Sequence, residues 1–413
     1  MEQAGRKLRT GYTTGTCAAA AAAAAALAFL RLSEGSDDGK EESLSVPAVT
    51  VSTPDGTSLT LGIADSGVRA DGSVFCAVKK DSGDDPDITN GVLVYVKVRG
   101  GCPDVGAEDA AVTPAYTDPA CPGVYLSGGE GIGTATKAGL QVPVGYPAIN
   151  PVPRRQIIRT VYDILKESHE KGKTSGTMPV TVTISIPGGK ELAQKTFNPR
   201  LGIEGGLSVL GTTGIVRPMS EDALIETIRR DIRVKAAGGR KLLAAAPGNY
   251  GAAFLKERFG LEAEEFVTCS NYVGETFRML REEGIHEVLF AGHMGKLIKV
   301  AGGILNTHSK YGDHRMEITA DCAKEAGASE ELQAKLLGMN TTDEAAECLK
   351  AEGILHEVLQ IAAERIRKIL NAGYGIPAEV IIFTGKGDMG MTAGAAALAE
   401  RISRSGTESR DEE

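Results

Sequence analysis

The first half of the chain alternates hydrophobic and polar residues over short stretches. Runs rich in valine and threonine, at 48–63, 74–80 and 92–100, are separated by turns of glycine, aspartate and proline. This alternation predicts the strands of an antiparallel sheet. Apolar residues spaced three to four positions apart over 152–172 predict a helix. We therefore expect residues 1–217 to form an α+β domain.

Further elements complete this half. The segment 179–197 has strand-like residues on both sides of a Pro-Gly-Gly sequence, which predicts a hairpin that turns at 187–189. The polar, charged segment 33–43 predicts a loop.

Nine consecutive alanines, residues 18–26, follow a stretch of threonine and glycine. Alanine has the highest helix propensity, so this run predicts a helix. Thr13, Thr14 and Thr16 can offer hydroxyl groups to the free N–H groups at its start. Two interpretations remain open. The run forms a tightly packed core helix, or its N-terminus, which has no acidic residue in the first turn, binds an anion.

The second half of the chain has a different rhythm. A short apolar strand, a turn rich in glycine, asparagine or histidine, and a helix recur at 241–251, 264–280, 286–303 and 379–402. Alternating strands and helices predict a doubly wound parallel sheet, hence an α/β domain over 218–403. Ligands of such sheets bind at the carboxyl ends of the strands. The last residues, 404–413, are polar and are expected to be a disordered tail.

Composition narrows the class of protein. The 413 residues carry a net charge of −9, which argues against a general nucleic-acid binder but not against a small anionic ligand in a local basic pocket. Seven scattered cysteines form no C-x-x-C pair, so we expect a reduced, cytoplasmic protein without a structural metal site. The apolar stretch that begins with the alanine run is weakly hydrophobic and is interrupted by Arg31, so no membrane span is expected. The N-terminus lacks the pattern of a signal peptide, so none is expected.

Three glycine clusters are candidate nucleotide-binding turns. The cluster at 128–139 lacks the ending of a phosphate-binding loop and leads into a proline-rich segment. Gly385, Gly387 and Gly390 match G-x-G-x-x-G between an expected strand and helix, but the chain ends before a second strand could follow. The turn at 246–251 is less regular, but it follows the first strand of the parallel domain, where cofactors bind.

Three loops are richer in polar residues than packing requires. One is the glycine-rich segment 198–220, and another is the acidic loop 80–91, which is either a solvated turn or a recognition loop. The third, 291–315, contains His293, Lys296, Lys299, His308, Asp313 and His314. The spacing of its histidines matches no common zinc site, so it is a polar ligand site or ordinary surface.

Several arginines lie beside glycine-, proline- or threonine-rich loop sequence. They are Arg9, Arg154, Arg155, Arg200 and Arg217. Because a guanidinium group can bind a carboxylate through two hydrogen bonds, their shared context favours a polyanionic ligand.

Several long motifs resemble one family. They are RTGYTTGTCAAAA, KDSGDDPDITNG, VGYPAINPVPR, NPRLGIEGGLSVLGTTGIVRPMS, SNYVGETF and GHMGKLIKVAGGILNTHSKYGDHRME. Together they are similar to the CbiD family, the cobalt-precorrin-5B C(1)-methyltransferases of anaerobic cobalamin biosynthesis. The matches run in order to about residue 317.

The resemblance implies a fold and a reaction. It implies a first domain like domain 2 of ribosomal protein S5 and a second, Rossmann-like domain. The reaction is transfer of a methyl group from S-adenosylmethionine to ring carbon 1 of cobalt-precorrin-5B, which gives cobalt-precorrin-6A. Cobalt enters as part of the substrate, so no metal site in the protein is expected. A homo-oligomer and transient contacts with neighbouring pathway enzymes both stay open as partners.

With this reaction, the candidate residues acquire roles. The carboxylate arms of the corrinoid would bind at the five arginines and at the cap formed by Thr13, Thr14 and Thr16. S-adenosylmethionine would bind at the strand-end turns, through Gly248, Asn249, Tyr250, Gly251, Ser270, Asn271 and Gly292. His293 and His308 are candidate general bases, with Asp313 as a third catalytic residue. A nucleotide-dependent enzyme and a non-catalytic corrinoid-binding protein remain as alternatives.

Overall fold

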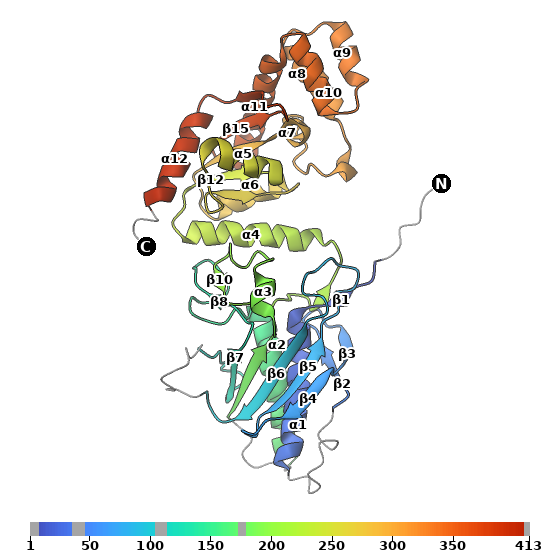
Figure 1. Ribbon diagram of the computed structural model, residues 1–413, viewed down its shortest axis with the longest axis vertical. Helices are drawn as coiled ribbons and strands as arrows, with labels where there is room; N and C mark the ends of the chain where they lie inside the picture. Colours follow the sequence, from blue (N-terminus) through green and yellow to red (C-terminus); the bar gives the residue numbers. More distant parts are fainter. Residues whose placement is uncertain (1–7, 35–45, 104–113, 172–178, 409–413) are drawn as a thin grey trace, which may run out of the picture. The chain divides into compact units, whose positions relative to one another are not determined.

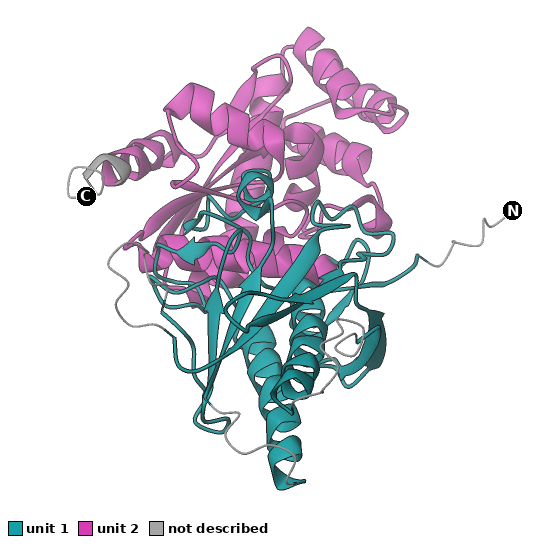
Figure 2. Cartoon of the chain, turned by 60° about the horizontal axis from the view of Figure 1, so that its bottom comes forward, with its two compact units in different colours: residues 1–220 teal, residues 221–413 magenta. Residues whose placement is uncertain are grey.

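The chain divides into two compact units, residues 1–220 and 221–413 (Figures 1 and 2). The computed structural model describes residues 8–34, 46–103, 114–171 and 179–408. Most of the loop expected at 33–43 lies outside these ranges. Both units are mixtures of helices and sheets, as the sequence predicted at this coarse level, and the sheet of each unit contains a parallel strand pair, which the sequence predicted for the second unit alone.

Unit 1 is built on a five-stranded sheet. Its order is β4 (Asp65–Val68), β5 (Val74–Lys79), β6 (Leu93–Gly100), β9 (Val180–Ser185) and β7 (Val124–Gly128). All neighbours are antiparallel except β9 and β7. Alternate residues of β6, Val94, Val96 and Val98, are fully buried, because one face of the sheet is covered by helices.

Three further strand pairs complete unit 1: one is a local hairpin, β2 with β3, and the other two join segments that are distant in the sequence. They are β1 (Gly11–Tyr12) with β11 (Ile215–Val216), β2 (Ala48–Ser52) with β3 (Ser58–Gly62), and β8 (Thr134–Ala135) with β10 (Ile203–Glu204). The pairing of β1 with β11 brings the loop before the alanine run next to the end of unit 1. The glycine cluster at 128–139 connects β7 to β8, so it does not open a helix.

The alanine run lies in α1 (Thr14–Ser33), a helix of the unit 1 core. All nine alanines are buried between the sheet and α2 (Pro151–Glu170). A Cβ atom added at Gly15 would lie 2.6 Å from Cβ of Pro153, so the two helices approach too closely there for any side chain. Helix α1 is long and apolar enough to cross a membrane by length and composition alone, but most of it is buried inside unit 1.

The prediction of a hairpin that turns at 187–189 is wrong. Strand β9 ends at Ser185, and the chain then enters a short helix, α3 (Gly189–Ala193). The sheet leaves no room for a hairpin partner, because β6 and β7 already occupy both edges of β9. Gly189 instead packs against the backbone of Gly131, whose oxygen lies 2.3 Å from where a Cβ atom would stand.

Unit 2 contains the predicted parallel sheet. Its order is β13 (Phe266–Thr268), β12 (Leu242–Ala246), β14 (Glu287–His293), β15 (Ala378–Phe383) and β16 (Met389–Met391). The first four strands are parallel, and β16 is an antiparallel edge strand. The described helices are α4 (Glu221–Ala237), α5 (Asn249–Phe259), α6 (Val273–Glu282), α7 (Met294–Ala301), η2 (Ser309–Tyr311), α8 (Arg315–Glu325), α9 (Glu330–Leu337), α10 (Thr342–Ala351), α11 (Leu355–Tyr374) and α12 (Ala395–Glu408).

Helices cover both faces of this sheet. Leu243 and Ala245 of β12 belong to a core shared with α4, α6, α7 and α11. Ala244 and Ala246 face a second core, with Leu255 of α5 and residues of α12. This alternation within one strand explains the continuous apolar run in the sequence, since both faces of a doubly wound sheet are buried.

The strand order contains one reversal. From β12 the chain moves to β13 on one side, and then returns to place β14 on the other side of β12. The carboxyl ends of β12 and β14 therefore lead into helices on opposite faces of the sheet, which is the place where ligands of doubly wound sheets bind. The turns after these two strands are 247–249 and the start of α7 at Met294.

The C-terminal region differs from the prediction in two ways. The G-x-G-x-x-G sequence lies in a turn between antiparallel strands β15 and β16, not between a strand and a helix. A Cβ atom at Gly390 would lie 2.4 Å from the backbone of Leu359, so this glycine serves the packing of β16 on α11. Helix α12 continues to Glu408, beyond the expected start of the tail at 404, because Leu398 and Ile402 anchor it to the sheet. Residues 409–413 lie outside the described ranges.

Candidate functional site

The turn after β12 is tightly constrained. Gly248 has a φ of 84°, a conformation that residues with a Cβ atom rarely adopt, and Asn249 begins α5. Gly251 packs on the sheet, where a Cβ atom would lie 2.9 Å from the oxygen of Ala291. A Cβ atom at Gly292, near the end of β14, would lie 3.0 Å from the Pro247 ring. Small residues thus let the turns after β12 and β14 approach each other closely.

Lys296 links three strand-end segments. It lies in the first turn of α7, and its Nζ donates a 3.0 Å hydrogen bond to Oδ1 of Asn271, in the turn after β13. The same Nζ lies 3.5 Å from the position of a Cβ atom on Gly248. Thr307 donates a second hydrogen bond, of 3.1 Å, to Oδ1 of Asn271. Burial lowers the pKa of the Lys296 ammonium group below its usual range.

Sequence reasoning named Lys296 only as one member of a polar loop. Ser270, before Asn271, has a positive φ of 52°, so the turn after β13 is itself strained. The predicted cofactor residues Gly248, Asn271 and Gly292 therefore meet around a lysine that was not among them. The sequence did offer one indication of Lys296: it lies three residues after His293, the last residue of β14, and therefore close to a strand end.

His293 closes β14 and caps α7. Its Nδ1 accepts a 3.1 Å hydrogen bond from the N–H of Gly295. A nitrogen that accepts a hydrogen bond carries no proton, so the neutral ring has its proton on Nε2. Nε2 lies 3.6 Å from Oδ1 of Asp343, at the start of α10. In this arrangement His293 is a hydrogen-bond donor at Nε2, and action as a base requires the cap at Nδ1 to open.

A row of rings lies beside His293. Tyr250, in the first turn of α5, is 79% exposed, and its ring centre is 6.1 Å from that of His293. Phe383, the last residue of β15, lies 5.8 Å from His293 and stacks on Phe254 at 4.1 Å. The exposed Tyr250 ring therefore offers a π-face to a ligand at the strand ends.

The other two predicted catalytic residues have separate partners. His308 is exposed, and its Nδ1 caps η2 by accepting a 3.1 Å hydrogen bond from Lys310. Asp313 pairs with Arg315, and their hydrogen bond holds the pKa of Asp313 below its usual value. Among the described residues, Asp313 makes no hydrogen bond to His293 or His308. The structure thus does not join the three residues into one hydrogen-bonded group.

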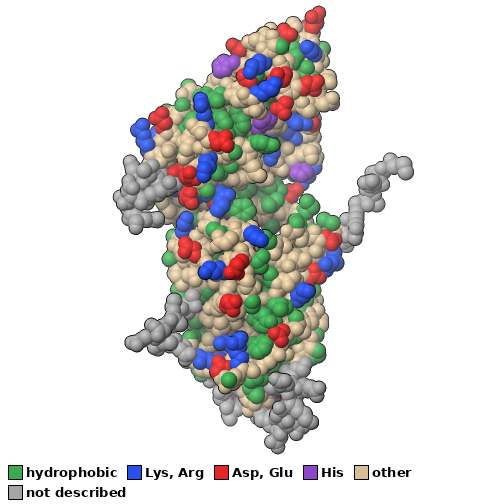
Figure 3. All heavy atoms as spheres, in the orientation of Figure 1, with side chains coloured by type: hydrophobic (Ala, Val, Ile, Leu, Met, Phe, Trp, Pro, Cys, Tyr) green, Lys and Arg blue, Asp and Glu red, His purple; other side chains and the backbone are tan. Residues whose placement is uncertain are grey.

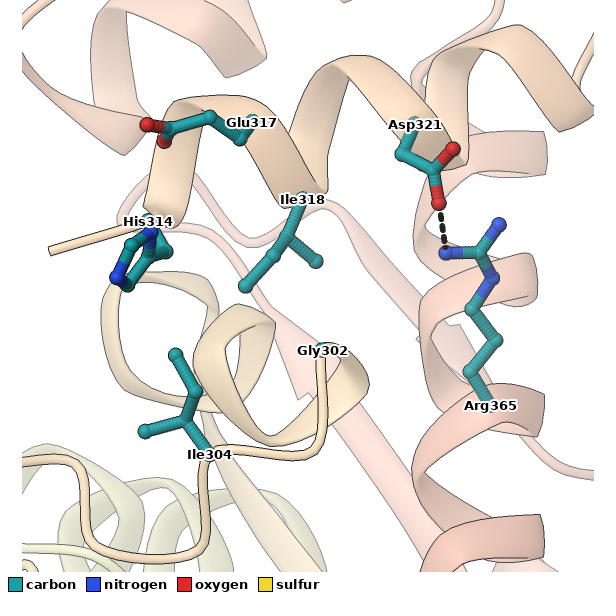
Figure 4. Close-up of a pocket in the computed structure, with 7 residues that line it drawn as sticks. All are labelled: Gly302, Ile304, His314, Glu317, Ile318, Asp321 and Arg365. Atoms are coloured by element: carbon teal, nitrogen blue, oxygen red, sulfur yellow. Dashed lines mark hydrogen bonds and ion pairs between the residues drawn. The ribbon is translucent and has the colours of Figure 1, made fainter. Parts of the chain in front are cut away.

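His314, another histidine of the predicted polar loop, lines a different hollow of unit 2 (Figure 4). This hollow is bordered by Gly302, Ile304, His314, Glu317, Ile318, Asp321 and Arg365. Arg365 is already paired with Asp321 at 2.7 Å and with Glu325 at 2.6 Å. The loop 291–315 therefore contributes to two places: Lys296 and Thr307 contact Asn271 at the strand ends, and His314 lines the other hollow.

In unit 1, the polar groups at the start of α1 bond within the protein. Oγ1 of Thr13 accepts the N–H of Thr16 at 3.2 Å, and Oγ1 of Thr16 donates to the oxygen of Gly214 at 2.8 Å. The N–H of Gly15 donates to the oxygen of Leu210 at 2.9 Å. Thr14 and Thr16 are buried. A carboxylate at this cap would compete with these bonds, which favours the interpretation of α1 as a core helix.

The acidic loop 80–91 is organised around a buried lysine. Nζ of Lys80 donates to Ser82 at 2.8 Å, to Thr89 at 2.7 Å and to the carboxylate of Asp87. Arg9 pairs with Asp81 through two hydrogen bonds, of 2.5 and 2.9 Å. Arg9, one of the five arginines predicted to bind the substrate, is therefore already bonded to a carboxylate of its own chain.

The other predicted arginines have different environments. The guanidinium group of Arg154 lies 4.2 Å above the Tyr116 ring, and that of Arg200 lies 5.7 Å from the Phe197 ring. Arg155, in the first turn of α2, and Arg217, directly after β11, are exposed. Figure 3 shows basic and acidic side chains interspersed on the face that it draws.

The fold and these contacts define a class: a two-unit α/β protein whose parallel sheet carries glycine-rich turns and a half-buried lysine at its strand-order reversal. Within the described residues, no three His, Cys, Asp or Glu side chains are grouped to hold a metal ion.

Comparison with known proteins identifies the family. The family model described as CbiD matches residues 1–218, and that of the CbiD C-terminal domain matches residues 306–394. A cobalt-precorrin-5B C(1)-methyltransferase of Ruminiclostridium cellulolyticum is 42% identical over 92% of this chain and 90% of its own length. One of Methanocaldococcus jannaschii is 39% identical over 93% and 96%. The chain belongs to the CbiD family. The match extends to residue 394, past the point near 317 where the motifs ended.

A solved structure is also similar. The cobalamin biosynthesis protein (cbiD) of Archaeoglobus fulgidus is 25% identical and aligns over 74% of this chain and 84% of its own, with a TM-score of 0.35.

Proposed function

We propose that this chain transfers a methyl group from S-adenosylmethionine to carbon 1 of cobalt-precorrin-5B, giving cobalt-precorrin-6A. The observation that carries this proposal is the 42% identity, over 92% of the chain, to a relative of that name. The finer fold assignment, an S5 domain 2-like unit 1 and a Rossmann-like unit 2, belongs to the same proposal. So does a cytoplasmic location.

The strand ends of unit 2 fit the methyl donor. The open space above Gly248, where a Cβ atom would stand, lies beside an ammonium group and close to the exposed Tyr250. The carboxylate of S-adenosylmethionine can bind the ammonium group. Its positive sulfonium can lie against the aromatic ring of Tyr250. When bound, it supplies a methyl group on an activated sulfur. Gly248, Asn249, Tyr250, Gly251, Ser270, Asn271 and Gly292 would hold it.

The chain then acts mainly by positioning. Methyl transfer is an in-line displacement, so holding donor and acceptor in the attack geometry accounts for much of the barrier reduction. His293, with its Nε2 proton, can donate a hydrogen bond to a polar group of the bound substrate. A role for His293 or His308 as general base stays a prediction, and it requires their Nδ1 caps to open.

The corrinoid carboxylates would bind basic side chains of unit 1. Arg155 and Arg217 are the strongest candidates, because both are exposed on loops or helix ends that the β1–β11 pairing and α2 hold in place. Arg154 and Arg200 would contribute beside their rings. Arg9 and the Thr13–Thr16 cap are weaker candidates, since both already have partners in the chain. Cobalt enters with the substrate.

The test is direct turnover. The purified full chain is incubated with cobalt-precorrin-5B and S-adenosylmethionine bearing a labelled methyl group, and the product is analysed by mass spectrometry. We expect one labelled methyl group on ring carbon 1. Binding of the corrinoid without methylation would instead indicate a non-catalytic binding protein. Binding of ATP or NAD, but not of S-adenosylmethionine, would indicate a nucleotide-dependent enzyme.

A further inference from the structure

Among the described residues, the buried lysines Lys80, Lys235 and Lys299 and the half-buried Lys296 have different partners, and Lys235 pairs with Asp231. Lys80 donates to two hydroxyl groups and a carboxylate, and Lys299 donates to the oxygens of Thr307 and Gly312. Lys296 has one acceptor, Oδ1 of Asn271, and among the described residues it takes part in no ion pair. Because an ammonium group has three N–H donors, Lys296 keeps two for a ligand.

The place of Lys296 defines the kind of ligand. It extends from α7 to the turn after β12, at the strand-order reversal between β12 and β14, where ligands of doubly wound sheets bind. The position of a Cβ atom on Gly248 is 3.5 Å from Nζ, so the backbone turn comes up to the ammonium group without a side chain between them. A half-buried cation without a carboxylate partner is stabilised by an anionic ligand group.

We infer that Lys296 binds the carboxylate of the methionine part of the methyl donor. The inference rests on the proposed function, because it names the part of S-adenosylmethionine that this side chain recognises. Charge sets the orientation: an ammonium group attracts the carboxylate and repels the sulfonium. The sulfonium and adenosine would then extend away from Lys296, with the exposed Tyr250 ring as the nearest aromatic surface of α5.

The experiment compares two ligands that differ only in this carboxylate, S-adenosylmethionine and its decarboxylated form. Both are titrated calorimetrically into the wild-type chain and into Lys296→Met. We expect the substitution to weaken S-adenosylmethionine binding by about tenfold to a hundredfold, the usual range for a lost charge-assisted hydrogen bond. Binding of the decarboxylated ligand should stay unchanged or become tighter, because its positive charge no longer meets an ammonium group.

Two further variants complete the design. Lys256→Met removes an exposed lysine of α5 that pairs with Glu262, and it should bind both ligands as the wild type does. Lys296→Arg keeps the charge and should recover most of the affinity for S-adenosylmethionine. Melting temperatures of all variants show whether each one is folded.

Several results would overturn the inference. These are an equal loss of both ligands in folded Lys296→Met, no loss of either, and weakened corrinoid binding with normal S-adenosylmethionine binding. All three leave the proposed function intact, provided that the wild type binds and uses S-adenosylmethionine. A wild type that neither binds nor uses it would contradict the function itself.

Discussion

The start of α1 in unit 1 and the strand ends in unit 2 look alike in sequence but differ in how their polar groups are satisfied. Both are rich in glycine and small polar residues, and both precede a helix without acidic residues in its first turn. In unit 1, Thr13, Thr16 and Gly15 complete their hydrogen bonds with the chain itself. In unit 2, Lys296 retains donors that no described residue accepts.

The difference shows why such motifs are ambiguous before the fold is known. A polar loop can bind a ligand where the tertiary structure leaves its hydrogen-bond donors without partners. Where other residues of the chain accept those hydrogen bonds, the loop has a structural role. In the acidic loop, the buried Lys80 pairs with the carboxylate of Asp87, so its charge already has a partner within the loop. At the strand ends, the half-buried Lys296 meets only an amide oxygen. The same substitution should therefore reduce stability in the first region and not in the second.

The largest expected effect comes from Lys80→Met in unit 1. The side chain of Lys80 is 2% exposed and bonds to Asp87, so its removal leaves a mostly buried carboxylate without its cation. Breaking such a pair costs about 3–5 kcal/mol of unfolding free energy. Lys296→Met, in contrast, removes a desolvated charge and should not reduce stability. Urea unfolding of both variants measures the contrast, and an equal loss in both would contradict it.

The pH dependence of stability tests the same pair of regions. Burial opposes ionisation of Asp87, but Lys80 and its hydrogen bonds outweigh this and bring its pKa below the usual 3.8. Asp87 therefore stabilises unit 1 above that value, and the contribution is lost as the pH falls through its folded pKa. Lys296 has a lowered pKa, so the cost of its charge is present at neutral pH and is relieved as the pH rises toward 10.5. The free energy of unfolding of wild type, Lys80→Met and Lys296→Met can be measured from acid to alkaline pH. The difference between Lys80→Met and wild type should shrink at acid pH, and that between Lys296→Met and wild type should shrink at alkaline pH.

Gly248→Ala should weaken binding of S-adenosylmethionine by about tenfold, as expected for one disturbed charge-assisted contact. The new Cβ atom would lie 3.5 Å from Nζ of Lys296, at a φ of 84°. Gly260→Ala is a control for a positive φ alone, because Gly260 ends the same helix with a φ of 66° and has open space around it. Gly260→Ala should cost about 1–2 kcal/mol of stability, and Gly248→Ala should cost more, because its φ of 84° with a ψ of −175° is a conformation that essentially only glycine adopts. Equal affinities in calorimetry would move the donor site elsewhere.

His293→Asn separates the two roles of this histidine. Asparagine is a good N-cap, so it should preserve α7, whereas His293→Ala should cost about 1 kcal/mol of stability. If His293 acts as cap and donor, His293→Asn should keep single-turnover methylation within about tenfold of wild type. A loss of about 10²–10⁴-fold in both variants would instead identify it as the general base. The same pair at His308 tests the second candidate.

The smallest effect is expected from Arg9→Ala. Its guanidinium group is exposed and already bonded to Asp81, so corrinoid binding should change by less than about threefold, as for other exposed ion pairs. Arg155→Ala should weaken it by about tenfold. Titration of the corrinoid at two salt concentrations measures both, with the Arg155 contact losing strength as salt rises. A larger loss at Arg9 than at Arg155 would restore the anion-binding interpretation of the α1 cap.

Much of the fold could be predicted because local pattern and tertiary structure agree. The alanine run, the period of α2 and the first three strand–turn–helix units appear as expected, since burial on one or both faces is visible in the sequence. The hairpin at 187–189 failed because β9 pairs with β6 and β7, which lie far away in the chain. The antiparallel strand β16 was missed because three residues give too short an alternation.

The candidate site could be predicted only in part. Turns at the ends of parallel strands follow from the fold class, so Gly248, Asn271 and Gly292 were found as neighbours of a ligand site. Which side chain points between them depends on helix phase, and this is why Lys296 was not singled out. The partners of Arg9 and Asp313 depend on contacts that no motif encodes.

The alanines of α1 also have a consequence for how unit 1 responds to change. An alanine has no rotamers, so the buried surface of this helix forms without loss of side-chain conformational entropy. For the same reason it cannot adapt by rotamer rearrangement when a neighbour grows. With Gly15 pressed against Pro153, any added volume must be absorbed by moving one backbone against another. We expect α1 to be rigid. Because an alanine methyl group is attached directly to Cα, the motion of its axis in NMR relaxation measurements should report the motion of the backbone.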